Sequence, residues 1–90
     1  MNANELTNLL ALINEVINAP TKKDAKPLVN RLKFEATKIK HHISDPYLSN
    51  KLDEAIIYAE EASGRVTNKE HWESCAKQSW YTFESGIITK

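Results

Sequence analysis

Two apolar stripes on either side of the short segment Ser44-Asp45-Pro46 constrain the fold more than any other feature of the sequence. In each stripe the apolar side chains recur every three or four residues, which places them on one side of an α-helix. The first stripe predicts a helix over Ala25–Ile43 and the second predicts a helix over Pro46–Ser63. The apolar positions are Leu28, Val29, Leu32, Ala36, Ile39 and Ile43 in the first helix, and Leu48, Leu52, Ala55, Ile56, Ala59 and Ala62 in the second.

The residues that flank the second helix carry start and stop signals. Asp45 can accept hydrogen bonds from the free amides of the first turn, and the fixed φ of Pro46 suits the first helical position. Gly64 predicts the end of this helix, because glycine adopts a left-handed conformation without steric cost. Two helices with so short a link lie antiparallel, so we expect a long central helical hairpin.

A further helix is expected on each side of the hairpin. The first spans Asn4–Asn18, with an apolar side made of Leu6, Leu9, Leu10, Ile13, Val16 and Ile17, and Pro20 follows its end. The last begins at a capping box formed by Thr67 and Glu70, runs to about Ser85 and ends at Gly86. Its apolar side includes Trp72, Ala76, Ser79, Trp80 and Phe83, and Ile87 and Ile88 form a short tail that packs back or meets a partner.

These four helices predict an all-α fold, a small antiparallel bundle of four helices that forms a single domain over residues 1–90. A chain of 90 residues has a small core, so self-association would add stability, and a homo-oligomer is expected. No apolar run reaches the ~20 residues that a membrane span requires, and no signal-peptide pattern is present. With Cys75 as the single cysteine, no internal disulfide can form, which favours the cytoplasm.

Charge is balanced overall but uneven along the chain. The 12 basic and 12 acidic residues give a net charge of zero, which argues against a general binder of duplex nucleic acid. Seven of the 12 basic residues lie between Lys22 and Lys40, whereas Lys51–Glu61 contains four acids and one lysine. One interpretation is a pair of solvated faces that attract each other within the bundle or between subunits.

The other interpretation is an anion site at the start of the second helix. Lys22, Lys23 and Lys26 crowd a helix N-terminus, where free amides and the helix dipole favour an anion. Thr21 adds a hydroxyl, and Tyr47 is a candidate for stacking on a base. The pattern predicts a phosphate site that includes Lys22 and Lys26.

Two large apolar residues fall outside the core stripes. Phe34 lies about 200° around its helix from Leu32, and Ile57 lies on the outer side of the next helix. Either residue is buried against a second neighbouring helix or belongs to an interface between subunits.

Catalytic and metal-binding patterns are weak. His41, His42 and His71 do not provide the three or four convergent ligands of a metal site, so no metal and no cofactor are expected. His71 and Cys75 are four residues apart and can touch, but a Cys–His nucleophile also needs an orienting group and an oxyanion site. We therefore expect a protein that is not an enzyme.

The hairpin resembles the phage family of cyclic-nucleotide sponges that counter CBASS antiviral defence. The resemblance covers about forty residues and consists of an amphipathic helix, the corner Ser44-Asp45-Pro46, and then Leu48, Leu52, Asp53, Glu54, Ala55, Tyr58 and Ala59. It implies a small all-α protein that forms oligomers and sequesters cyclic di- or trinucleotides between subunits without cleaving them. Such a pocket needs cations for phosphates and rings for bases, and Lys22, Lys26, Arg65 and Tyr47 are the candidates for these roles.

An alternative resemblance is to the pediocin-like bacteriocin immunity family of four-helix cytosolic proteins. The segment Pro27-Leu28-Val29-Asn30-Arg31-Leu32 looks like a helix start of that family, although it falls one helix too early and the characteristic C-terminal tail is missing. This resemblance implies a helical immunity or inhibitor protein that binds a toxin or another protein partner.

Overall fold

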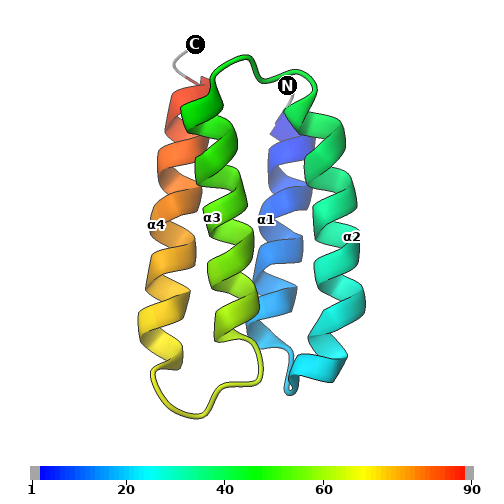
Figure 1. Cartoon of the computed structure of the whole chain (residues 1–90), viewed down its shortest axis with the longest axis vertical. Coiled ribbons are helices and arrows are strands. Elements are labelled where there is room, and N and C mark those ends of the chain that lie inside the picture. Colours follow the sequence, from blue (N-terminus) through cyan, green and yellow to red (C-terminus); the bar gives the residue numbers. More distant parts are fainter. Residues whose placement is uncertain (1–2, 89–90) are drawn as a thin grey trace.

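Four antiparallel helices make up the structure, a computed structural model that describes residues 3–88. They are α1 (Ala3–Asn18), α2 (Lys22–Lys40), α3 (Pro46–Ala62) and α4 (Lys69–Ile88). Each helix runs opposite to the one before it, so that α1 begins and α4 finishes at the same end of the bundle (Figure 1). The predicted all-α bundle with a central α2–α3 hairpin is confirmed.

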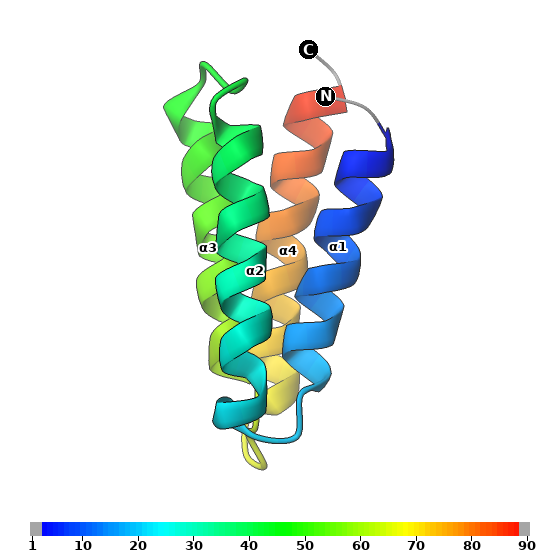
Figure 2. The ribbon, with the colours of Figure 1, turned by 90° about the vertical axis from the view of Figure 1, so that its right-hand side faces the viewer.

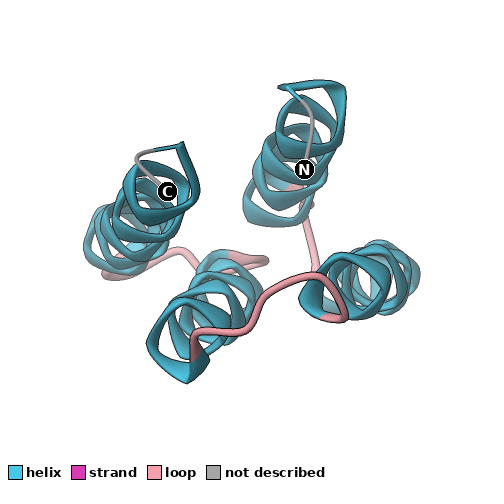
Figure 3. Ribbon diagram, turned by 90° about the horizontal axis from the view of Figure 1, so that it is seen from above, coloured by secondary structure: helices cyan, strands magenta, loops and turns pink. Residues whose placement is uncertain are grey.

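The helices form two layers, one made of α2 and α3 and the other of α1 and α4 (Figures 2 and 3). Helix α3 packs against all three other helices and most extensively against α4, whereas α1 and α4 touch very little. One side of α3 therefore remains for solvent, and the outer sides of α2 and α3 together form a broad surface.

The core lies along the bundle axis and matches the predicted apolar stripes closely. All six positions predicted for the inner side of α3 are buried, and Trp80 and Phe83 of α4 are the largest fully buried side chains. Leu10 and Ile43 are only partly buried, while Leu12 belongs to the core although it lies outside the predicted stripe. Nearly every large apolar side chain of the interior therefore packs against α1, α3 or α4.

Helix starts follow the hydrogen bonding of their caps. Asp45 accepts a hydrogen bond from the amide of Tyr47 at 2.9 Å, which confirms the predicted start of α3. Helix α2 begins at Lys22 and not at Ala25, because the hydroxyl of Thr21 accepts from the amide of Asp24 at 3.0 Å and so caps the helix one turn earlier. It ends at Lys40, three residues before the predicted end.

The start of α4 differs from the predicted capping box. Asn68 has a φ of +60°, and the helix begins at the next residue, Lys69. A capping box between Thr67 and Glu70 requires Asn68 to have helical dihedral angles, so the left-handed conformation of Asn68 removes it. Asparagine tolerates this conformation better than most residues.

The two glycines have different roles. Gly64 has a φ of +66° and follows the end of α3, as predicted. Gly86, predicted to end α4, lies inside the helix, which continues to Ile88. A Cβ atom at Gly86 would crowd the end of the flexible Leu48 side chain, so glycine at this position allows close packing of α4 on α3 and does not stop the helix.

Candidate functional site

Helix α2 concentrates positive charge on a molecule with no net charge. It carries seven basic and two acidic side chains, a net charge of +5, whereas α3 carries four acidic and one basic side chain, a net charge of −3. Because its inner side packs into the core, α2 directs most of its cations to solvent. The exposed cations of α2 are Lys22, Lys23, Lys26, Arg31, Lys33 and Lys38.

Phe34 lies in the middle of this positively charged surface. Its side chain is 63% exposed, and the ammonium of Lys38 lies 4.8 Å from the centre of its ring. An exposed aromatic ring beside cations provides a flat apolar surface for a base and positive charge for a phosphate. The predicted position of Phe34 outside the core of its own chain is confirmed.

A groove of about 410 Å³ runs between α2 and α3 beside this surface. The buried Ala36 and Ile56 lie at its base, and Lys33 stands at its edge without an ion pair to any residue in the described part of the chain. The ammonium of Lys40 contacts both carboxylate oxygens of Asp53 across the groove, at 2.8 and 3.0 Å. The remaining groove residues are Thr37 and Ile57.

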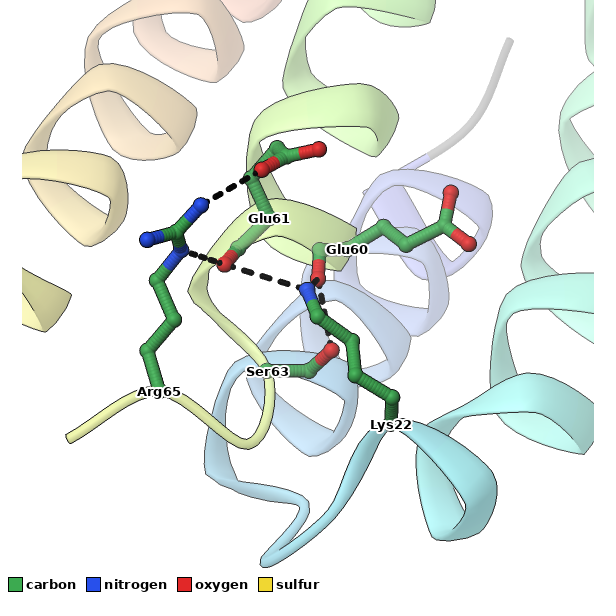
Figure 4. A network of polar contacts seen from close by, with 5 residues as sticks. All are labelled: Lys22, Glu60, Glu61, Ser63 and Arg65. Atoms are coloured by element: carbon green, nitrogen blue, oxygen red, sulfur yellow. Dashed lines mark hydrogen bonds and ion pairs between the residues drawn. The ribbon is translucent and has the colours of Figure 1, made fainter.

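Lys22 and Arg65, two of the predicted ligand-binding residues, converge at the C-terminal end of α3 (Figure 4). The ammonium of Lys22 donates to the backbone carbonyls of Glu60 and Glu61, the latter at 3.2 Å. The guanidinium of Arg65 donates to the carbonyl of Glu61 at 2.5 Å and to its carboxylate at 2.8 Å. Ser63 donates its hydroxyl to the Glu60 carbonyl at 2.6 Å. These groups satisfy the free carbonyls of the helix end and complement its dipole.

The same contacts affect the ionisation of Glu61. The hydrogen bond from Arg65 holds the pKa of the Glu61 carboxyl below its ordinary value, and the positive charges of Lys22 and Arg65 act in the same direction. Lys69 extends the arrangement to a second helix, since its ammonium donates to the carbonyl of Ile17 at 2.6 Å. Lys22 of α2 and Lys69 of α4 therefore bind carbonyls at the ends of α1 and α3 and tie the four helices together at this end of the bundle.

The other predicted ligand residues lie apart from this end or face solvent. Lys26 is exposed one turn along α2 from Lys22, on the edge that leads toward the groove. Tyr47 is 56% exposed in the first turn of α3, at the opposite end of that helix, about 20 Å from Arg65 by the rise of the helix. The structure thus brings Lys22 and Arg65 together and separates both from Tyr47.

The groove residues Lys33, Thr37 and Lys40 were not singled out from the sequence. Lys26, Lys33 and Lys40 repeat every seven residues, a spacing that keeps them on one edge of a helix, and this repeat is the signal that could have identified them. The packing of α2 on α3 determines that this edge faces α3. It also determines that Asp53 and Ile57 complete the groove.

The contact that the spacing of His71 and Cys75 allows is present in the structure. The sulfur of Cys75 lies 3.9 Å from Nε2 of His71, in a partly buried position on α4. Within residues 3–88, no three side chains of His, Cys, Asp or Glu gather as a metal site would require. None of the helices in this part of the chain has both the length and the apolarity needed to cross a membrane.

No protein-family model, curated protein or solved structure matches the chain.

Proposed function

We propose that this protein is a non-catalytic binding protein that sequesters a phosphate-bearing nucleotide signal, with a cyclic di- or trinucleotide as the ligand and counter-defence in a phage-infected cell as the role. The observation that carries the proposal is the net charge of +5 on α2, exposed beside the groove between α2 and α3. A neutral protein that concentrates cations on one helix attracts anions to that helix.

The groove and its surroundings suit the parts of a nucleotide. Lys33 provides an ammonium that is free of intrachain ion pairs among the described residues, and Lys26 lies two helical turns away on the same edge. That distance allows the two ammonium groups to contact separate phosphates of one ligand, each through charge-assisted hydrogen bonds. The exposed ring of Phe34 adds a stacking surface for a base.

Lys22 and Arg65 contribute to this proposal in a different way from the sequence prediction. Both donate to carbonyls at the end of α3, so their roles in ligand binding are limited to the positive potential that they add near Lys26. Tyr47 would stack on a base only if the ligand or a second subunit reached the other end of the bundle. The proposed contacts are therefore centred on Lys26, Lys33 and Phe34.

Calorimetric titration of the wild-type protein with a panel of cyclic di- and trinucleotides tests the proposal. Replacing Lys33 with Ala should weaken binding about tenfold, because a charge-assisted hydrogen bond contributes about 1.5–3 kcal/mol and 1.4 kcal/mol corresponds to a factor of ten. Lys77→Ala is the matched control, since Lys77 lies on α4 and its ammonium contacts Glu73 at 3.1 Å. Absence of heat of binding across the whole panel, or equal weakening by both variants, contradicts the proposal.

The alternative function is that of an immunity or inhibitor protein that binds another protein. Phe34 and Ile57 support this alternative, because exposed apolar side chains on a broad surface suit a protein partner. It predicts no binding across the nucleotide panel, a monomer or a dimer in solution, and a tight protein partner in a pull-down, so the titration and the pull-down separate the two functions.

A further inference from the structure

The outer surfaces of α2 and α3 form one continuous side of the bundle, here called the α2–α3 face (Figure 3). We define it by the exposed or half-exposed side chains of Lys26, Lys33, Phe34 and Thr37 on α2 and of Asp53, Glu54, Ile57 and Glu61 on α3. Two of the five large apolar side chains that the described structure exposes, Phe34 and Ile57, lie on this face, with 63% and 54% of their surfaces accessible.

Phe34 and Ile57 lie near one another along the bundle. Lys33, which precedes Phe34 in the chain, lines the same groove as Ile57. One apolar side chain therefore projects from each helix, on opposite sides of a groove whose base is also apolar. Each would lose an unfavourable contact with water if a surface of the same kind covered it.

The charges of the face are also divided between the two helices. The cations belong to α2, with its net charge of +5, and the anions belong to α3, with its net charge of −3. By formal charge the face thus has a positive half on α2 and a negative half on α3, where Asp53, Glu54 and Glu61 each contact a cation of their own chain. Such a surface is complementary to the same surface of a second copy, provided that the second copy is rotated so that its positive half faces the negative half of the first.

We propose that the α2–α3 face binds a second copy of this chain through a two-fold axis parallel to the bundle axis. This rotation places α2 of each copy over α3 of the other, so that Phe34 contacts Ile57 of the partner copy and Ile57 contacts Phe34. It also places the positive helix of each copy over the negative helix of the other. Both contacts occur twice, as in every isologous dimer.

A second two-fold axis, which runs across the helices, would also bring the two α2–α3 faces together, but electrostatics favour the axis parallel to the bundle. An axis across the helices would place α2 on α2, so that two helices with a net charge of +5 each would face one another. Like charges brought together at an interface disfavour association. The same repulsion excludes a contact made by α2 alone, unless an anion lies between the copies.

The size of the face is adequate for a dimer of moderate affinity. The backbone of the chain extends over 38 Å along the bundle and 20 to 23 Å across it, so one side has about the area, about 800 Å², that each partner of a standard interface buries. The inference does not rest on the proposed function, because the apolar and ionic contacts need no ligand. A second copy on this face would close the groove that contains Lys33 and cover Phe34, so the dimer and the proposed nucleotide complex exclude one another.

Disulfide cross-linking of two different variants tests the proposed axis. The native thiol is removed by Cys75→Ser, and then Phe34→Cys is introduced into one chain and Ile57→Cys into another. Mixing the two chains under mild oxidation should produce a covalent dimer, because position 34 of one copy contacts position 57 of the other and the Cα atoms come within the 4.4–6.8 Å of a disulfide. The contact between the unmodified Ile57 and Phe34 of the two chains remains in this mixed dimer.

The controls separate this arrangement from random collision. Neither variant alone should cross-link with itself, since the axis holds the two copies of each position apart. Tyr81→Cys, at a side chain that is 64% exposed on α4, should not cross-link with Phe34→Cys. Cross-linking of Phe34→Cys with itself, or of Tyr81→Cys as readily as Ile57→Cys, overturns the proposed axis.

Sedimentation of the wild-type chain and of Ile57→Asp completes the test. The wild type should form a dimer, and Ile57→Asp should weaken association about a hundredfold, because a carboxylate would then be buried against Phe34. A wild-type chain that remains monomeric at about 1 mM, or that forms a trimer or a larger ring, overturns the inference. Binding of a cyclic nucleotide by a wild-type chain that remains monomeric would overturn the inference and leave the proposed function standing.

Discussion

Replacement of Gly64 by Ala should destabilise the fold strongly, because Gly64 joins three helices. The residue follows the end of α3 with a φ of +66°, and its amide donates to the carbonyl of Ala19 at 3.1 Å. A Cβ atom there would lie 2.8 Å from the backbone nitrogen of Lys22 and 3.0 Å from two backbone atoms of Thr21. These backbone atoms belong to the capped start of α2 and have little freedom to move.

The expected loss follows from two costs and one gain. A left-handed conformation costs a residue with a Cβ atom about 1–2 kcal/mol, and forcing an extra carbon into a packed site costs about 1–3 kcal/mol. Alanine also reduces the entropy of the unfolded chain, which returns about 0.4–1 kcal/mol. The free energy of unfolding should therefore fall by about 2–4 kcal/mol, against a total of about 5–13 kcal/mol for a domain of this length.

Urea denaturation followed by circular dichroism measures this loss, and the melting temperature should fall by about 10–30 °C. Gly64→Asn is the informative companion, because asparagine tolerates the left-handed conformation but still places a Cβ atom against Lys22. Its free energy of unfolding should be higher than that of Gly64→Ala and lower than that of the wild type. Gly64→Ala with a free energy of unfolding within about 0.5 kcal/mol of the wild type would refute the reasoning.

Two further predictions concern the core and the end of α3. Leu32→Asp should abolish the cooperative melt, because Leu32 is 0% exposed and an unpaired carboxylate would be buried; a variant with full helicity and a cooperative transition would contradict the assignment of the α2 inner side. Titration of Glu61 followed by NMR should give a pKa below the ordinary value of 4.5, and Arg65→Gln should raise it toward that value; an unchanged pKa would show that the Arg65 contact does not hold in solution. Since the folded-state pKa is the lower one, this contact stabilises the fold above pH 4.5, and its contribution is lost as the pH falls through the folded-state pKa of Glu61.

The sequence predicted the hairpin because its signals are local. The stripe that contains Leu52 and Ile56 has a single helical period, and Asp45 with Pro46 defines the helix start through contacts within four residues. The errors at the start of α2 and of α4 come from local caps, whereas the error at Gly86 involves a distant element. Gly86 looks like a helix stop, yet α4 continues through it to Ile88 and packs there against Leu48 of α3.

The candidate site was harder to predict because charge alone does not reveal what a cation contacts. Lys22 looked like a phosphate ligand at a helix N-terminus, but the end of α3 lies close enough for its ammonium to bind two carbonyls. Lys33 lies in the middle of α2 and gave no such signal, although it lines the groove with Ile57. The packing of α2 on α3 distinguishes these two lysines, and neither helix encodes that packing by itself.

Capture and release of ligand tests the central claim most directly. The wild-type protein is incubated with a mixture of cyclic di- and trinucleotides, separated from the unbound molecules and denatured by heat, and the released nucleotides are identified by mass. The account predicts that one class of cyclic nucleotide is recovered intact, and that Lys33→Ala retains less of it than Lys77→Ala. Recovery of no nucleotide, or of a linear cleavage product, would contradict the claim that this helical bundle sequesters its ligand without catalysis.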